Sequence, residues 1–237
     1  MHTAILIAAL LTAAPALPKD QIETSSGPLG ITFIAHATVM LEWNGKIIQV
    51  DPCGKLTDYT LLPKADLVLV THEHPDHLDP KAIETVSKEG TVLVCTAACA
   101  KAGLKGTVMK NGDRQTVAGI AIEAVPAYNL SRKRPDGELY HPKGAGNGYV
   151  LSFGDTRVYI AGDTEGVPEM EALKDIGVAF LPMNLPYTMT PEEVAGAARS
   201  FLPKILYPYH TGETEVSKVV ALLKDTPAID VRVRAMK

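Results

Sequence analysis

The residues with the clearest chemical meaning lie in one short segment, VTHEHPDHLDP, at positions 70–80. It holds His72, His74 and His77, three of the chain's seven histidines, together with Asp76. A turn or a helix start accounts for the aspartate and proline that end the segment, because aspartate caps helices and proline favours their first position. It does not account for the histidines. Imidazole and carboxylate groups at this density are typical of a metal site.

The spacing of these side chains divides them between two ions. His72 and His74 are two residues apart, so in an extended backbone their side chains point the same way and can bind one ion. Asp76 and His77 follow a turn at Pro75 and can reach a second ion. The segment therefore predicts a binuclear site.

Other polar residues follow apolar, strand-like runs, as ligands held at the edge of a sheet would. They are Asp51, Asp163 in AGDT and His210 in YPYH, with Asn129 or His141 in the loop after IEAVPA. A carboxylate between two cations can bridge them. We therefore expect Asp163 to bridge the ions and His210 to complete the second one.

The elements that would position these residues fall into two similar halves. In the first half, runs at 31–43 and 46–52 flank Asn44-Gly45, a hairpin signal. Strands are also expected there at 65–72 and 91–95, and a run at 116–127 continues the first sheet. Helices are expected at 80–90, where Gly90 closes the helix, and at 96–103.

The second half opens with a hairpin in which residues 146–153 and 156–164 pair across Gly154-Asp155. The elements expected after it are helices at 168–175, 190–201 and 215–225 and strands at 178–184, 204–210 and 228–234. Thr190 and Glu193 form a capping box at the start of the middle helix. Hairpins followed by alternating strands and helices predict an α/β (α+β) fold, with two mixed sheets and helices outside.

Composition predicts one domain over residues 17–237. The chain has 237 residues, of which 46% are hydrophobic and 21% charged, and no linker rich in proline, glycine or serine separates its halves. The apolar run from Ala4 to about Ala14, followed by APA, is too short to span a bilayer and predicts a secretory signal peptide over residues 1–16. The alternative is a buried first strand or helix. With cleavage the protein would be periplasmic or secreted, and otherwise cytoplasmic.

Charge and cysteine usage limit the partners. With a formal net charge of −4, the protein as a whole is not attracted to the phosphates of a nucleic acid. The only basic cluster, RKR at 132–134, is interpreted as a solvated loop. No other stretch is apolar enough for a membrane span. Cys53, Cys95 and Cys99 lack zinc-finger spacing, and a helical i, i+4 arrangement does not suit a disulfide between the last two, so we expect them to be packing residues.

THEHPDH followed by AGDT and a late strand-end histidine resembles the metallo-β-lactamase superfamily, with its HxHxDH signature, from about Gly30 onward. The resemblance implies an αββα sandwich with a binuclear site at one edge. The implied ligands are His72 and His74 on the first metal, Asp76, His77 and His210 on the second, and Asp163 between them. Within the superfamily, IAHATVMLEWNGKIIQVDP, GYVL, LPMNLPYTMTPEEVAGAA and PKILYPYH are similar to the branch that includes ascorbate-6-phosphate lactonase and N-acyl-phosphatidylethanolamine-hydrolysing phospholipase D.

One position departs from the family pattern. Related sequences often have a histidine ligand shortly after the strand equivalent to IEAVPA, where the nearest residue here is Asn129. We expect His141, twelve residues later, to reach back and complete the first metal. The alternatives are a weak amide oxygen from Asn129 or a water.

The remaining polar residues receive supporting roles. His36 is expected to lie under the metals or to face the substrate, unless it is a core or hairpin histidine. Asp51 is expected to orient a ligand histidine, because metal-bound imidazoles usually donate their other N–H to a carboxylate or carbonyl. Asn184 and Tyr187 lie in a loop that would line the pocket, although a turn role explains them as well.

These expectations together predict a metal-dependent hydrolase of a small-molecule ester, lactone or phosphodiester. Two divalent cations would make hydroxide available near neutral pH, and Asp76 would orient it or accept its proton. Zinc is expected first, and manganese or iron also suits nitrogen and oxygen ligands. The alternatives are a non-catalytic metal-binding protein, an iron redox enzyme or, with least support, a β-lactamase. The sequence leaves the oligomeric state open.

Overall fold

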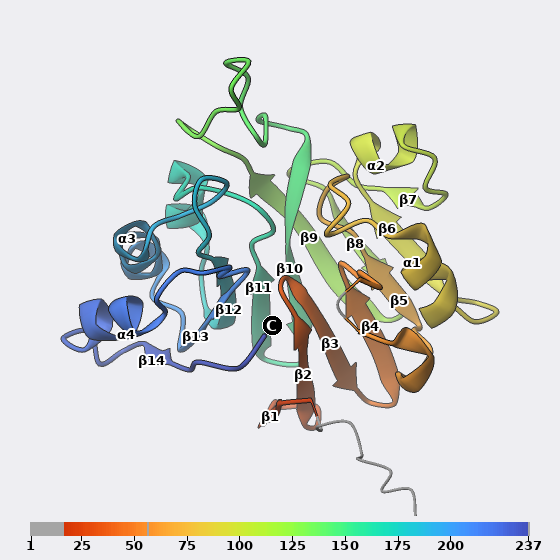
Figure 1. Ribbon diagram of the computed structural model, residues 1–237. Coiled ribbons are helices and arrows are strands. Elements are labelled where there is room, and N and C mark those ends of the chain that lie inside the picture. The colour runs from red at the N-terminus through yellow and green to blue at the C-terminus, as the bar shows by residue number, and fades with distance from the viewer. Residues whose placement is uncertain (1–16, 56, 237) are drawn as a thin grey trace, which may run out of the picture.

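The computed structural model describes residues 17–55 and 57–236, and its strands form two sheets of seven strands each. The sheets pack face to face, and helices cover their outer sides (Figure 1). The α/β fold with two mixed sheets and outer helices is therefore confirmed. The predicted signal peptide at residues 1–16 lies outside the described residues.

The first sheet has its strands in sequence order. The strands are β1 (Lys19–Ile22), β2 (Leu29–Ala35), β3 (Thr38–Trp43), β4 (Lys46–Val50), β5 (Leu67–Leu69), β6 (Val92–Cys95) and β7 (Thr107–Val108). Pairing is antiparallel from β1 to β4 and parallel from β4 to β7. The predicted hairpin is present, with Trp43 opposite Lys46 and φ of 48° at Asn44 and 72° at Gly45. The run at 31–43 is divided into two strands by a turn that begins at His36.

The second sheet also has its strands in sequence order, from β8 at one edge to β14 at the other. Its strands are β8 (Arg114–Val117), β9 (Ile120–Ala127), β10 (Gly146–Phe153), β11 (Thr156–Ile160), β12 (Ile176–Pro182), β13 (Ile205–Tyr209) and β14 (Asp230–Val231). The predicted pairing of β10 with β11 is present.

The prediction that residues 116–127 continue the first sheet is wrong. These residues contribute to β8 and β9, which turn at Ala118-Gly119, and β9 pairs along its length with β10 in the second sheet. The buried Ile120, Ile122 and Ala124 face the core between the sheets. Their alternating pattern suits either sheet, so the choice depends on a strand that comes about twenty residues later in the chain.

The helices lie outside the sheets. They are α1 (Pro80–Val86) and α2 (Ala97–Lys101) on the first sheet, α3 (Pro191–Phe201) and α4 (Ser217–Leu223) on the second, and two 3₁₀ helices, η1 (Tyr59–Leu61) and η2 (Pro168–Ala172). The capping box at α3 is present. Four helix predictions overran at their C-terminal ends. The first helix ends at Val86, where the extended Ser87 caps it, rather than at Gly90, and the one at 168–175 is a 3₁₀ helix that ends at Ala172. The helices predicted at 96–103 and 215–225 end at Lys101 and Leu223.

Three apolar clusters hold these layers together. The largest lies between the sheets and contains the fully buried aromatic rings of Phe33, Phe153 and Phe180. The other two lie between each sheet and its helices. Cys95 and Cys99 are buried in the cluster under α1 and α2 and are free thiols, consistent with a packing role. In the part of the chain that is described, no helix is long and apolar enough to cross a membrane.

Candidate metal centre

The predicted site residues meet at one edge of the two sheets, where strands from both deliver them. His36 follows β2, Asp51 follows β4 and His210 follows β13. These three side chains sit on residues with φ of 51°, 47° and 48°, in the left-handed region that residues other than glycine rarely adopt. Such backbone costs about 1–3 kcal/mol per residue and is common where function requires a particular side-chain direction.

The first group of donors contains His72, His74, His141 and Asp163, whose ligand atoms lie within 4.8 Å of one another. His74 Nδ1 is 3.1 Å from His72 Nε2 and 3.1 Å from His141 Nε2. His141 Nε2 is 3.3 Å from Asp163 Oδ2. The structure thus brings His141 into this group, while the side-chain amide of Asn129 lies at His141 Nδ1 and the Tyr187 carbonyl.

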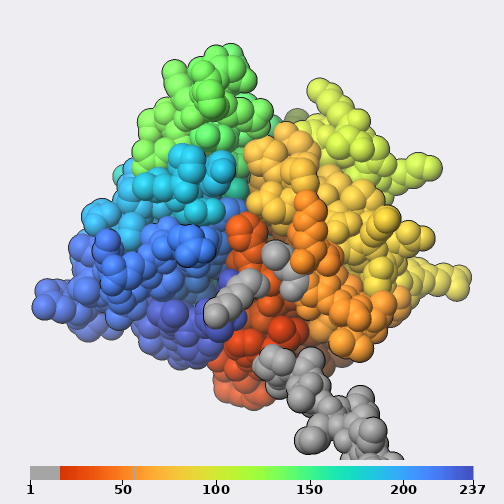
Figure 2. Space-filling model, viewed as in Figure 1, coloured from red at the N-terminus to blue at the C-terminus, as the bar shows by residue number. Residues whose placement is uncertain are grey.

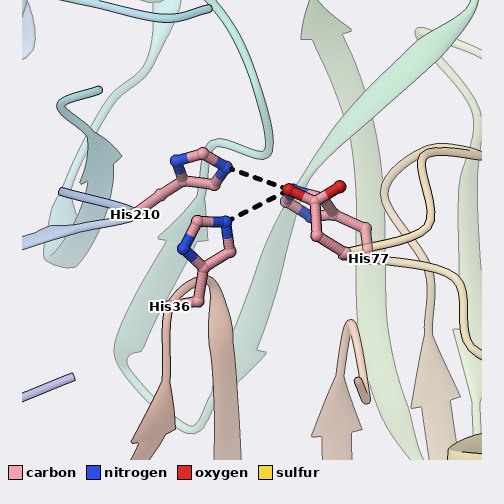
Figure 3. A group of neighbouring side chains, drawn as sticks. His36, His77 and His210 are labelled. Atoms are coloured by element: carbon pink, nitrogen blue, oxygen red, sulfur yellow. Dashed lines mark hydrogen bonds and ion pairs between the residues drawn. The ribbon is translucent and has the colours of Figure 1, made fainter. Parts of the chain in front are cut away.

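The second group contains His36, Asp76, His77 and His210. His36 Nε2 lies 3.1 Å from Asp76 Oδ2, and His210 Nε2 lies 3.7 Å from the same oxygen. Figure 3 shows the rings of His36 and His210 pointing toward this carboxylate, with His77 beside it. His36 lies in the turn of the β2–β3 hairpin, and its ring joins the second donor group.

Asp163 lies between the two groups. Its Oδ2 is 3.3 Å from His141 Nε2 of the first group and 3.3 Å from His210 Nε2 of the second, and its Oδ1 is 3.3 Å from His77 Nε2. Gly162 allows this placement, because its φ is +65° and a Cβ there would lie 3.0 Å from Thr71 Cβ. A carboxylate in this position can contact two cations at once.

The donor geometry fits metal ions. Four ligands placed tetrahedrally at a zinc–nitrogen distance of about 2.0–2.1 Å are about 3.3 Å from one another. Four of the separations within the first group, 3.1 to 3.9 Å, are close to this value, and all its ligand atoms lie within 4.8 Å of one another. Among the described residues, His77 Nε2, Asp163 Oδ1 and His210 Nε2 are buried without a hydrogen-bond partner. Buried polar atoms nearly always have one, so facing atoms without partners fit the role of ligands to a cation.

Neighbouring polar groups fix the ring orientations. Asp51 is fully buried, and its Oδ2 lies 2.8 Å from His77 Nδ1 while Thr71 donates to both carboxylate oxygens. Asn129 Oδ1 accepts hydrogen bonds from the His141 backbone N–H at 2.8 Å and lies 2.8 Å from His141 Nδ1. Each contact leaves the opposite nitrogen, Nε2, directed at the donor groups.

The carboxylates at the centre favour positive charge beside them. Burial alone would raise the pKa of Asp163, but His210 and His77 hold it well below its usual range. Burial and the neighbouring His77 hold the pKa of His72 well below its ordinary value, which leaves the ring neutral with a free lone pair. Burial would also lower the pKa of His210, but the Asp163 and Asp76 carboxylates raise it to about 10.

A cavity of about 460 Å³ opens over both groups. Asn184 and Tyr187 line it, as predicted for their loop, and the sequence reasoning missed two further lining residues, Arg134 and Tyr140. Their loop, between β9 and β10, rises as the green segment at the top of Figure 2. A signal was present in the sequence, because both residues lie in the stretch that carries His141.

The start of this loop is held by Glu165, which the sequence reasoning also missed. Its buried carboxylate accepts hydrogen bonds from the backbone N–H groups of Leu130, Ser131 and Arg132 at 2.7, 2.8 and 3.0 Å. Nη2 of Arg132 in turn donates to both carboxylate oxygens of Glu193 on α3, at 2.8 and 2.7 Å. The reading of RKR as a solvated loop is therefore wrong for Arg132, which is a structural ion-pair residue.

Known proteins share this sequence and fold. Residues 30–210 match a family model described as a beta-lactamase superfamily domain. A UPF0173 metal-dependent hydrolase of Koribacter versatilis is 33% identical over 201 residues, which are 78% of this chain and 84% of the relative. A second, from Methanopyrus kandleri, is 34% identical over 197 residues, 77% of this chain and 84% of the relative.

Solved structures agree with these matches. A crystal structure from Parabacteroides distasonis, of a protein assigned as a metal-dependent hydrolase, superimposes with a TM-score of 0.89 at 52% identity and covers 93% of this chain and 100% of that one. The metallo hydrolase Igni18 of Ignicoccus hospitalis has the same fold, with a TM-score of 0.73 at 24% identity, covering 88% of this chain and 95% of that one.

Proposed function

The chain belongs to the metallo-β-lactamase superfamily and, within it, to the UPF0173 metal-dependent hydrolases, and from this premise we propose that it is a binuclear hydrolase of a small-molecule ester, lactone or phosphodiester. One observation carries the proposal. Two groups of histidine and carboxylate donors share Asp163 at the floor of a cavity of about 460 Å³.

We assign the ligands from the two donor groups and from the resemblance to the metallo-β-lactamase superfamily. His72, His74 and His141 hold the first ion, Asp76, His77 and His210 hold the second, and Asp163 contacts both. The set contains nitrogen and carboxylate oxygen and no thiolate, so zinc is our first assignment, with manganese and iron also compatible. His36 holds Asp76 Oδ2 at 3.1 Å and is assigned a positioning role.

The ions would supply Lewis acidity that makes water nucleophilic near neutral pH. The chain's own residues orient that chemistry. Burial would raise the pKa of Asp76, but His210 and His36 hold it far below its usual range, so the carboxylate stays ionised and is a weak base. Asp76 therefore aligns the attacking water by accepting a hydrogen bond, and His36 keeps its oxygen in place.

The type of bond is the finer part of the proposal. The resemblance to the ascorbate-6-phosphate lactonase and N-acyl-phosphatidylethanolamine-hydrolysing phospholipase D branch stays a prediction, and it favours esters, lactones and phosphodiesters over β-lactams. The non-catalytic alternative depended on the histidine missing at Asn129. His141 takes that position in the first donor group, which supports turnover.

The test is a substrate panel on zinc-loaded protein, with a simple ester, a lactone and bis-p-nitrophenyl phosphate. We expect turnover of at least one class, and a loss of about 10²–10⁴-fold in kcat in Asp76→Asn. Asp136→Asn, which changes an exposed carboxylate on the cavity loop, is the matched control and should leave kcat unchanged. Absence of turnover across the panel by protein that carries its metals would contradict the proposal.

A further inference from the structure

Arg134 places a cation at the cavity of the metal centre without a carboxylate to neutralise it. Its guanidinium has no carboxylate within 4.0 Å in the described ranges 17–55 and 57–236, whereas Arg132, two residues earlier, is paired with Glu193. Its protein acceptor is the Tyr140 carbonyl, 3.1 Å from Nη2. A guanidinium has five N–H donors, so Arg134, which lines the cavity, keeps donors for a ligand bound there.

The backbone holds Arg134 in this position. Its N–H donates to the Glu138 carbonyl at 2.7 Å, and its carbonyl accepts from Gly137 N–H at 3.0 Å, which closes a tight turn. The neighbouring Lys133 forms a β-bridge with Leu139. A cation on a closed hairpin is preorganised to meet a ligand, because little backbone freedom is lost on binding.

A second donor lies beside the guanidinium. His74 directs Nδ1 at the other donors of its group, 3.1 Å from both His72 and His141, so its Nε2 carries the hydrogen when Nδ1 binds metal. That Nε2 is 3.1 Å from Arg134 Nη2. Two donors this close cannot satisfy each other, and an anionic oxygen between or beside them would accept from both.

An aromatic surface adjoins these donors. The rings of Tyr140 and Tyr187 meet edge to face with centroids 4.9 Å apart, and both residues line the cavity. Tyr187 is 41% exposed, so its ring is accessible to a ligand in the cavity. The cavity therefore offers a cationic corner and an apolar wall above the metal centre.

From this arrangement, and resting on the proposed hydrolytic function, we infer that Arg134 and His74 Nε2 form an anion subsite. The substrate then carries a carboxylate or phosphate group near the bond that is cleaved, with an apolar part against Tyr140 and Tyr187. The guanidinium fork binds such planar or tetrahedral oxyanions by charge-assisted hydrogen bonds.

The test compares three 4-nitrophenyl esters that differ at one end. The pentanoate ends in a methyl group, the glutarate monoester ends in a carboxylate, and the 4-phosphonobutanoate ends in a phosphonate. Each is assayed with wild type, Arg134→Ala, Arg134→Lys and the matched control Lys133→Ala, which removes the adjacent exposed charge from the same hairpin.

In Arg134→Ala we expect kcat/KM to fall about 10- to 100-fold on an anionic ester, as for loss of a charged hydrogen bond, and to stay within about 3-fold on the pentanoate. Arg134→Lys should recover part of the loss, and Lys133→Ala should match wild type. The ester with the larger Arg134 dependence shows whether the anion is a carboxylate or a phosphate. Equal losses on the neutral and anionic esters, or no loss on either, would overturn the subsite.

Calorimetry separates failure of the subsite from failure of the proposed function. Glutarate and inorganic phosphate are titrated into the zinc-loaded protein. If wild type turns over neither these esters nor the lactone and phosphodiester of the panel, the hydrolase proposal fails alone, and a tenfold or larger loss of affinity for one of these anions in Arg134→Ala still supports the subsite. Equal anion affinity in wild type and Arg134→Ala would overturn it whatever the activity.

Discussion

Asn129 lies where the resemblance to the metallo-β-lactamase superfamily predicts a ligand histidine, and its side chain contacts His141 instead. Its Oδ1 contacts both the backbone N–H and Nδ1 of His141, each at 2.8 Å, while its Nδ2 donates to the Tyr187 carbonyl at 2.8 Å. The amide thus joins the two loops that frame the cavity and fixes the ring that enters the first donor group. Such partners of ligand histidines typically change metal affinity 10- to 100-fold when they are mutated.

We predict that Asn129→Ala binds its first metal about 10- to 100-fold more weakly than wild type, because the His141 ring loses its orientation. His141→Ala should lose more, since a ligand itself is removed. Competition with a chromogenic chelator measures both affinities. If His141→Ala binds two metals with wild-type affinity, the assignment of His141 is wrong, and if Asn129→Ala does so, its positioning role is wrong.

At the scale of elements, the loop between β9 and β10 supplies site residues in addition to those at the strand ends. It carries His141, Arg134 and Tyr140, and its start is tied down by the buried Glu165 carboxylate. Burial would raise the pKa of Glu165, but hydrogen bonds from the backbone of Ser131, Arg132 and Leu130 lower it below its usual value. A carboxylate whose pKa is lower in the folded than in the unfolded chain stabilises the fold at neutral pH.

We predict that Glu165→Gln lowers the free energy of unfolding by about 1–3 kcal/mol at pH 7, because backbone donors at the loop start lose a charged acceptor. The contribution is present above the unfolded pKa, near 4.5, and is lost as the pH falls through the lower folded pKa. Denaturant unfolding at pH 7 and at about pH 3 should therefore show a difference between variant and wild type that shrinks in acid.

The matched control is Glu169→Gln, which removes a partly exposed carboxylate paired with Lys143 at 2.7 Å. It should cost less than about 1 kcal/mol, as surface pairs do. A loss for Glu165→Gln that equals the control, or that stays constant between the two pH values, would refute the role given to Glu165.

Local sequence patterns predicted most of the elements, but they did not predict which distant strands pair. Asn44-Gly45 specified its hairpin and Thr190 with Glu193 specified the start of α3, because these signals act within a few residues. Residues 116–127 were assigned to the wrong sheet because β9 joins the second sheet by pairing with β10, and no local signal specifies that pairing. Arg134 and Glu165 escaped notice for the same reason, as their roles depend on contacts with loops far along the chain.

At the scale of the whole molecule, two sheets built from separate halves of the chain meet at the metal centre. His36, Asp51, His72, His74, Asp76 and His77 come from the first half, and His141, Asp163 and His210 come from the second. Ions bound between the halves therefore link them, and binding that favours the folded state adds to its stability.

We predict that removing the metals lowers the melting temperature. At free zinc about 1,000 times its Kd, binding contributes about 4 kcal/mol per site, which corresponds to a shift of about 8–16 °C for a domain of this size. Scanning calorimetry with and without a chelator measures the shift, and readdition of zinc is the control. Identical melting temperatures in the two conditions would mean that no ion bridges the halves.

Export is a separate proposal at this scale. We propose cleavage after about Ala16 and a periplasmic or secreted mature protein, on the basis of the apolar run and the APA that follows it. Mass spectrometry of protein expressed from the full sequence in a secreting host should give a chain that begins near Leu17. An intact Met1 in such a host would reject the signal peptide and favour the cytoplasmic alternative.

The measurement that tests the central claim most directly is the metal content of protein purified without added metal or chelator, by elemental analysis. Two donor groups that share Asp163 predict two equivalents of divalent metal per chain, with zinc expected first. One equivalent would contradict the binuclear centre and leave one donor group without its assigned role. None would contradict the metal-dependent hydrolase as a whole.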